Sequence, residues 1–342
     1  MSLHAYRLRD GTREWTVPLP NAGTTPPALG SGPDGNPTLF VLSGQDRNNT
    51  GPGQGVVRAL DPATGEKRWA WSIARNLQGP VVSANGTLLV GNDSYGKAAV
   101  HALDAATGSE RWRFETGDVL HHMPTVAGGR VFVSSGRDQL AALALGDGAK
   151  QWETTALADD TRPVVVPEQG LVLVGNSFGV EAFCANSGDR VWRLVTSTQD
   201  TPEEDYFCVI SEPVVTNDRI YVQTHDTSPF AIGDVGQLYG LDPATGVVQW
   251  QLAAERPTSR LIGAGGVAIL RQAPAEQVPA PGETETPTDA ELIGVNAEGD
   301  IIWRLSEPWK PMAVGLERLL VYRGDRVSLD DEVTIGCLLL SE

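Results

Sequence analysis

The chain has 342 residues, of which 41% are hydrophobic and 20% are charged, so it is long enough to bury a sizeable core. Its formal charge of −17 argues against a nucleic-acid partner, because phosphate binding requires a basic surface. No run approaches the roughly 20 apolar residues that span a bilayer, so we expect no membrane insertion of this segment. The 38 glycines and 23 prolines are typical of many short strands joined by tight turns.

The cysteines and the termini say little about location. Cys184, Cys208 and Cys337 are scattered and show no Cys-x-x-Cys spacing, which favours buried free thiols over a disulfide framework or a zinc site. No apolar run resembles a signal peptide at the start. Residues 1–3 and 342 are candidate remnants of cloning, so an export signal removed upstream is compatible with the sequence.

One motif recurs along the chain and decides the fold class. Each copy ends in a tryptophan, and the copies span 6–15, 57–69, 100–112, 141–152, 180–192, 238–250 and 292–303. The tryptophans in register are Trp15, Trp69, Trp112, Trp152, Trp192, Trp250 and Trp303, whereas Trp71 and Trp309 lie outside the register. These tryptophans are separated by 40 to 58 residues. A repeat with a spacing of this size is the signature of a propeller or a solenoid.

Each copy is predicted to form a strand, a tight turn and a second strand. In the best copies the turn reads Asp-x-x-Thr-Gly, where the aspartate bonds the following backbone and Gly65, Gly108 or Gly246 accepts a positive φ. The tryptophan follows as a wedge against the neighbouring repeat. Residues 113–152 contain four such strands, which match one propeller blade, and helical periodicity is nowhere sustained.

The motif is complete at 102–112, nearly complete at 59–69 and 240–250, and degraded at 142–152, 182–192 and 293–303. At 142–152 we expect Leu145 and Asp147 to disturb the turn. This pattern resembles the tryptophan-docking motif of the PQQ-repeat β-propeller family, which includes quinoprotein alcohol dehydrogenases and BamB-like proteins. The resemblance implies an all-β chain, 1–342, forming one propeller of four-stranded antiparallel blades. It implies seven blades, with eight as the alternative, and a ring closed by strands from both termini.

The loops are predicted to differ between the two ends of each blade. In antiparallel blades, the loop joining strands two and three shares a face with the connection to the next blade. The long segments 43–55, 197–208, 225–236, 273–289 and 323–331 all fall on this face, and proline-rich 273–289 is expected to be mobile. Long loops on a rigid scaffold favour a binding role for this face.

The first strand of each blade begins on the same face, often just before a proline. The predicted channel mouth consists of Gln78, His121, His122, Arg162, Glu212, Arg260 and Lys310. This collar is basic overall and would bind a carboxylate or an acidic peptide loop through arginine forks. The alternative is that these charges pair with one another, for example Glu212 with Arg260.

Catalysis is not favoured by the residues present. A PQQ site needs oxygen ligands for Ca²⁺, and the family's enzymes carry adjacent cysteines over the cofactor, which this chain lacks. The neighbours His121 and His122 point apart on extended chain, which disfavours a shared metal ion. We therefore predict no catalytic residue, no metal and no cofactor, with PQQ and Ca²⁺ as the less favoured alternative.

The resemblance implies a non-enzymatic, monomeric, protein-binding scaffold of the bacterial cell envelope, in the periplasm or otherwise outside the cytoplasm. One alternative is the extracytoplasmic sensor or ligand-binding domain of a larger protein, such as a Ser/Thr kinase. The other is a PQQ-dependent dehydrogenase.

Overall fold

A computed structural model describes residues 2–7, 9–19, 27–32, 35–43, 55–74, 77–92, 98–118, 120, 122–136, 139–156, 161–176, 178–196, 207–209, 211–216, 218–226, 235–255, 261–272, 291–306, 310–315, 318–323 and 334–339. The chain divides into two compact units, Met1–Arg162 and Pro163–Glu342. The described part of the chain contains no helix with the length and apolarity that a membrane crossing requires.

The first unit contains a hairpin and three four-stranded antiparallel sheets, each built from strands consecutive in the chain. The hairpin pairs β1 (Ser2–Tyr6) with β2 (Arg13–Pro18). The first full sheet contains β3 (Ala28–Ser31), β4 (Pro37–Ser43), β5 (Gly55–Leu60) and β6 (Lys67–Ile73). The next contains β7 (Leu77–Ala84), β8 (Thr87–Asn92), β9 (Ala99–Asp104) and β10 (Glu110–Glu115). The last contains β11 (Thr125–Ala127), β12 (Arg130–Ser135), β13 (Gln139–Ala144) and β14 (Lys150–Thr155).

The second unit repeats this arrangement. Its first sheet contains β15 (Val164–Val166), β16 (Leu171–Asn176), β17 (Gly179–Cys184) and β18 (Arg190–Val195), with the short 3-10 helix η2 (Pro167–Gln169) between β15 and β16. The second contains β19 (Phe207–Val209), β20 (Val214–Val215), β21 (Ile220–Asp226), β22 (Val235–Leu241) and β23 (Val248–Glu255). The third contains β24 (Ile262–Ala264), β25 (Val267–Gln272), β26 (Glu291–Val295) and β27 (Ile301–Leu305). A three-stranded sheet of β28 (Lys310–Gly315), β29 (Arg318–Arg323) and β30 (Thr334–Leu339) follows.

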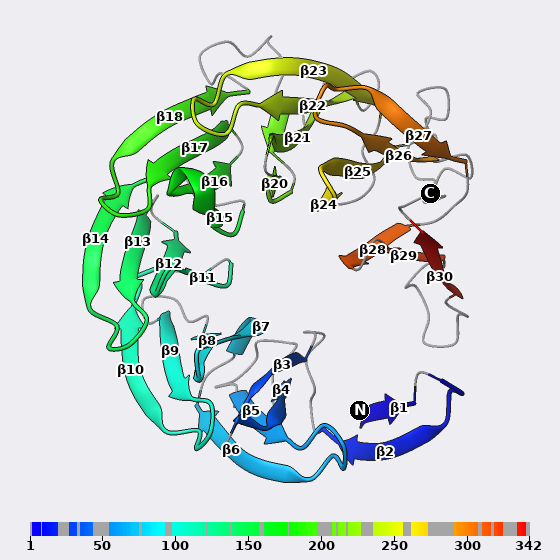
Figure 1. Cartoon of the computed structure of the whole chain (residues 1–342). Coiled ribbons are helices and arrows are strands. Elements are labelled where there is room, and N and C mark those ends of the chain that lie inside the picture. The colour runs from blue at the N-terminus through cyan, green and yellow to red at the C-terminus, as the bar shows by residue number, and fades with distance from the viewer. Residues whose placement is uncertain are drawn as a thin grey trace, which may run out of the picture. The chain divides into compact units, whose positions relative to one another are not determined.

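The predicted four-strand repeat is therefore confirmed at the level of the sheet. Figure 1 shows the strands β11 to β14 side by side in chain order, as the sequence of residues 113–152 predicted. The strands β8 and β12 are almost wholly buried. Side chains of β8 pack against both neighbouring sheets of the unit, Leu88 with Phe40 and Leu89 with Val131. Such strands are near-continuous apolar runs rather than alternating ones.

Apolar clusters join consecutive sheets within each unit. Phe40 and Leu42 of β4 pack with Leu88 and Val90 of β8 in one cluster. In the second unit the Tyr221 hydroxyl donates a hydrogen bond to the Gly266 carbonyl, and burial raises the pKa of Tyr221 to about 12, so that this donor keeps its proton. Sheet-to-sheet packing, rather than one central core, therefore stabilises each unit.

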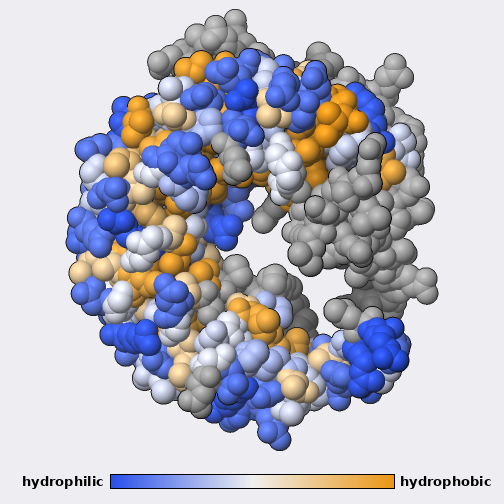
Figure 2. Space-filling view, viewed as in Figure 1, coloured by the Kyte–Doolittle hydropathy of each residue, from blue (hydrophilic) through white to orange (hydrophobic). Residues whose placement is uncertain are grey.

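The turn of the β1–β2 hairpin has charged, solvent-exposed side chains. Arg7 forms ion pairs with Asp10 and Glu14 at the turn of the β1–β2 hairpin. Figure 2 shows this hairpin as a strongly hydrophilic patch at the lower right. Exposed pairs of this kind contribute little to stability, so we assign the hairpin turn no further role.

Candidate functional site

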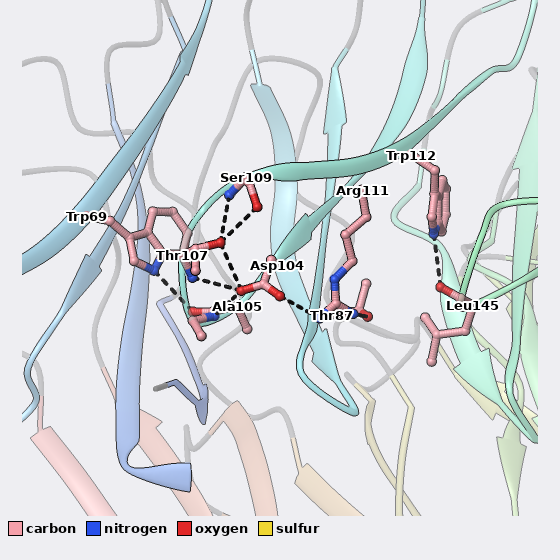
Figure 3. Close-up of polar contacts among 10 residues, drawn as sticks. Trp69, Thr87, Asp104, Ala105, Thr107, Ser109, Arg111, Trp112 and Leu145 are labelled. Carbon is pink, nitrogen blue, oxygen red and sulfur yellow. Dashed lines mark hydrogen bonds and ion pairs between the residues drawn. The ribbon is translucent and has the colours of Figure 1, made fainter. Parts of the chain in front are cut away.

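The Asp-x-x-Thr-Gly turn forms the hydrogen bonds that its residues predict. Asp104 accepts bonds from the backbone amides of Ala106 and Thr107 at 3.0 and 2.8 Å, and Gly108 closes the turn with φ +75°. Arg111 reaches back from β10 to Asp104 at 2.6 Å and to the Thr87 hydroxyl at 2.8 Å (Figure 3). The hydrogen bond from Arg111 is the main reason that the pKa of Asp104 lies below its ordinary value. The motif thus ties the turn to two strands of its own sheet.

The tryptophan of one sheet docks on the turn of the next. Trp69 donates a 3.1 Å hydrogen bond from Nε1 to the Ala105 carbonyl (Figure 3). Its ring also lies against Gly108. A Cβ added to Gly108 would lie 2.6 Å from the Trp69 ring, so glycine is required for contact as well as for its backbone angle. The turn and the wedge therefore form one inter-sheet contact.

The same contact recurs in both units. The docked pairs are Trp15 with Gly65, Trp69 with Gly108, Trp112 with Gly148, Trp192 with Gly246 and Trp250 with Gly299. Gly65, Gly108 and Gly246 have the positive φ that the sequence predicts, and Gly148 and Gly299 are two further glycines that sequence reasoning missed. Within the described residues, Trp152 contacts Phe132 and Trp303 lies against Gly294, each in its own sheet. Docking of these two tryptophans stays a prediction.

The expected disturbance of the turn at 142–152 is wrong. Ala144 stands where the aspartate should be, yet Gly148 still donates to the Ala144 carbonyl at 2.9 Å and has φ +71°. Asp147 bonds the Ala149 amide instead. The backbone and the glycine are sufficient for the turn, and the aspartate is dispensable.

The predicted channel-mouth residues fall into two groups. His122, Arg162 and Glu212 are half-buried, and Arg162 and Glu212 each directly precede a buried proline at the start of an inner strand. His121 and Arg260 lie outside the described residues, as do the side chains of Gln78 and Lys310 on β7 and β28. The collar as a whole stays a prediction.

The connections differ between the two ends of each sheet, as expected from strand direction. Turns 85–86, 128–129 and 265–266, between first and second strands, are tight, and so are the tryptophan turns such as 105–109. Connections between second and third strands are longer in several sheets, with β25 and β26 separated by 273–290. We call this end of each sheet the loop face. The predicted mobility of 273–289 lies outside the described residues.

The donors for a metal-bound quinone are not gathered among the described residues. No three His, Cys, Asp or Glu side chains come together in that part of the chain. Cys184 is a free thiol, as predicted, but it is half-buried rather than buried, and the side chains of Cys208 and Cys337 are outside the description. A Ca²⁺–PQQ group needs several convergent oxygen ligands, and the carboxylates of the described residues do not supply them as a cluster.

Two ionisable clusters were missed by sequence reasoning. His101 on β9 lies 2.9 Å from Glu110 on β10, and Glu181 on β17 lies 3.0 Å from Arg190 on β18. In both pairs the two residues are nine apart in the chain and lie on the third and fourth strands of their sheet. Aligning the repeats therefore places the two pairs at the same positions, which is a signal that the sequence contains. His101 also accounts for Trp71, the tryptophan of β6 that lies outside the repeat register. The ring centroids of Trp71 and His101 are 5.2 Å apart.

Comparison with known proteins was made by family model, by curated sequence and by structure. The family model for outer membrane protein assembly factor BamB matches residues 53–228 and 180–336. A search of curated proteins found no match.

Three solved structures resemble this chain at low sequence identity. BamB from Moraxella catarrhalis is 16% identical, with 88% of this chain and 92% of that chain covered and a TM-score of 0.48. Quinohemoprotein alcohol dehydrogenase from Comamonas testosteroni is 12% identical, with 94% and 68% covered and a TM-score of 0.63. Dihydro-heme d1 dehydrogenase NirN is 15% identical, with 98% and 68% covered and a TM-score of 0.65.

The last two likenesses are evidence for the fold alone, because enzymes and non-enzymes share this architecture. The family match covers more than half of the chain and agrees with the docked tryptophans and glycines. The chain belongs to the PQQ-repeat β-propeller family whose model is described as outer membrane protein assembly factor BamB.

Proposed function

We propose that this protein is a non-enzymatic, protein-binding scaffold of the bacterial cell envelope, acting outside the cytoplasm. The observation that carries the proposal is the family match over residues 53–336. The motif residues support it, because the tryptophans, glycines and aspartates are used in sheet-to-sheet docking and in closing the turns. Binding is then assigned to the loop face, where connections are long.

We further propose that the chain is one closed, monomeric propeller with β1 and β30 adjacent. The sheets β1–β2 and β28–β30 together contain one strand more than a four-stranded blade, which is compatible with seven blades or with eight. The native Cys337 on β30 offers a test. Cysteines introduced singly along β1, with Cys184 and Cys208 replaced by serine, are expected to form a disulfide with Cys337 at one position. No disulfide at any position contradicts the closure through β1 and β30.

The partner is proposed to present carboxylates to the loop face. Arg162 is the described cation of the collar, and an arginine fork binds a carboxylate through two parallel hydrogen bonds. Charge reversal at Arg162 is therefore expected to weaken partner binding, mainly by slowing association and by leaving a partner carboxylate unpaired.

Photo-crosslinking distinguishes the two ends of the sheets. A photoreactive amino acid is placed at Arg162 or Glu212 on the loop face, and at Ser109 or Ala149 on the tryptophan turns as matched controls. In envelope fractions of the native host, we expect one defined adduct from the loop-face positions, and we expect Arg162→Glu to abolish the adduct formed from position 212. Equal adducts from both ends, or none from the loop face, would overturn the scaffold proposal.

The competing enzymatic function has a direct test. The folded protein is titrated with PQQ and Ca²⁺ while visible absorbance and dye-linked alcohol oxidation are followed. Because the described residues lack a Ca²⁺ donor set, we expect neither saturable binding nor turnover. Stoichiometric binding of PQQ together with alcohol oxidation would contradict the scaffold proposal and would identify the protein as a dehydrogenase.

A further inference from the structure

His101 is a buried histidine whose two ring nitrogens both face oxygen atoms. The residue is 1% exposed in the middle of β9. Its Nδ1 lies 2.9 Å from Glu110 Oε2 on β10, and its Nε2 lies 2.8 Å from Asn92 Oδ1 on β8. The imidazole thus bridges the second, third and fourth strands of its sheet.

The two neighbouring oxygens decide the protonation of the ring. A neutral imidazole donates from one nitrogen and accepts at the other, whereas the imidazolium donates from both. A carboxylate and an amide oxygen are both acceptors, so a neutral ring would place a lone pair against an oxygen on one side. We propose that His101 is held as an imidazolium in the folded protein and forms an acid-strengthened clasp between the sheets β3–β6 and β7–β10.

The other side chains around the ring favour the charged form. Trp71, on β6 of the preceding sheet, has its ring centroid 5.2 Å from the imidazole, within the range of a cation–π contact. Arg113 lies directly across from His101 on β10, but its guanidinium is bonded to the carboxylate of Glu115. Asn92 on β8 and Trp71 on β6 carry no charge. Of the charged side chains on β10, Glu110 contacts the ring directly, and this carboxylate favours the charged form of the imidazole.

The clasp has a defined dependence on pH. Protonation is favoured in the folded state, so the stabilisation is fully present below about pH 6.5, where an unfolded histidine is also charged. It is lost as pH rises through the titration of the folded ring. Raising the pH therefore weakens the contact of Trp71 with His101, and lowering it restores the contact.

The protonation state is measured directly on the full chain. Long-range ¹H–¹⁵N spectra of the histidine rings are recorded from pH 5 to pH 9, with His101→Gln used to assign the signals. We expect both ring nitrogens of His101 to be protonated at pH 7. A single protonated nitrogen at pH 7 would mean that the Asn92 amide donates to a neutral ring, and would overturn the proposal.

A matched pair of variants tests the cause. Glu110→Gln removes the carboxylate while keeping the shape, and we expect the ratio of charged to neutral ring at a given pH to fall about tenfold, the lower end for a lost ion pair. Glu153→Gln removes a carboxylate at the corresponding outer strand β14, where it pairs with Lys150, and is expected to leave the His101 titration unchanged. An unchanged titration in Glu110→Gln would contradict the mechanism.

Hydrogen exchange tests the clasp between sheets. Protection factors of β6 and β9 amides, corrected for intrinsic rates, are expected to fall as pH rises from 6 to 9 in the native protein. In Trp71→Leu this dependence is expected to persist in β9 and to vanish in β6, since the leucine is apolar but has no aromatic ring to attract a cation. If the protection factors of the β6 amides in the native protein do not change with pH, the proposed contact between the two sheets is wrong.

Discussion

Two docking contacts, one in each unit, keep the same packing but differ in their polar groups. Trp112 lies on Gly148 and Trp192 lies on Gly246, and the two tryptophans are 8% and 9% exposed. Trp112 donates a 2.9 Å hydrogen bond to the Leu145 carbonyl (Figure 3), whereas Trp192 Nε1 is buried and has no acceptor among the described residues.

The turns beneath them differ in the opposite sense. The turn before Gly246 has its aspartate, Asp242, which bonds Ala244, Thr245 and the Thr245 hydroxyl. The turn before Gly148 has Ala144 at that place. Each contact therefore keeps the ring and the glycine and lacks one of the two polar features. We infer that ring packing on glycine defines docking, while either hydrogen-bonding feature is replaceable.

The largest loss of stability is expected when a docked tryptophan ring is removed. Trp112→Ala and Trp192→Ala are each expected to cost about 3–5 kcal/mol, because a large buried ring leaves a cavity between two sheets. Urea unfolding of the two variants measures this, with Val195→Ala, an exposed position at the end of β18, as a control within about 0.5 kcal/mol. A much smaller cost at Trp192 than at Trp112 would show that the hydrogen bond, not packing, carries the contact.

The next effect concerns the glycines. Gly148→Ala and Gly246→Ala place a Cβ 2.6 and 2.3 Å from the ring above, and both residues have positive φ, so we expect a loss of about 2–4 kcal/mol from strain and overpacking. Gly128 is the matched control, since it has φ +55° and nothing within 4 Å of an added Cβ. Gly128→Ala is expected to lose only the backbone part, about 1 kcal/mol. Equal losses at all three positions would show that the close contact between the ring and the added Cβ does not contribute to the cost.

These contacts also mark how far the sequence predicts the structure. The tryptophans, the turns and Gly65, Gly108 and Gly246 were predictable, because each requirement lies within a few consecutive residues. Gly148 was missed because the aspartate that marks the turn is replaced by Ala144, although the backbone hydrogen bonds persist.

The His101 cluster and the channel mouth depend on different information. His101, Asn92 and Glu110 meet through strand register, so their contact follows only once the hairpin pairing is known. The channel mouth depends on side chains at the ends of long connections, where no periodic pattern fixes direction or distance. Local chemistry therefore predicts the fold well and predicts the binding surface only as a region.

A smaller effect separates the two hydrogen bonds. Phenylalanine removes Nε1 and keeps most of the ring. Trp112→Phe leaves the Leu145 carbonyl without its donor, whereas Trp192→Phe removes a buried donor that has no described acceptor. We expect Trp112→Phe to cost about 1–2 kcal/mol more than Trp192→Phe. Unfolding midpoints measure the difference, and equal costs would place a hydrogen bond under Trp192 after all.

The smallest effect distinguishes the turns and depends on pH. The hydrogen bond from the Thr245 hydroxyl, with those from the Thr245 and Ala244 amides, holds the pKa of Asp242 below its ordinary value. Its stabilisation is therefore present above about pH 4, where an unfolded aspartate is ionised, and is lost as pH falls through the lower folded pKa. Asp242→Ala is expected to cost about 0.5 kcal/mol at pH 6, because the turn is largely solvated. The cost should shrink as the pH is lowered below about 4, measured as the difference in urea midpoint from the native chain.

Ala144→Asp completes the test, because the turn before Gly148 already has the backbone that the aspartate would cap. We expect this variant to gain a few tenths of a kcal/mol at pH 6 and nothing near pH 2, with Trp112 docking unchanged. Such a gain would show that the two polar features are additive rather than exclusive. A loss at pH 6 would mean instead that Asp147, which already bonds the Ala149 amide, leaves no room for a second carboxylate at this turn.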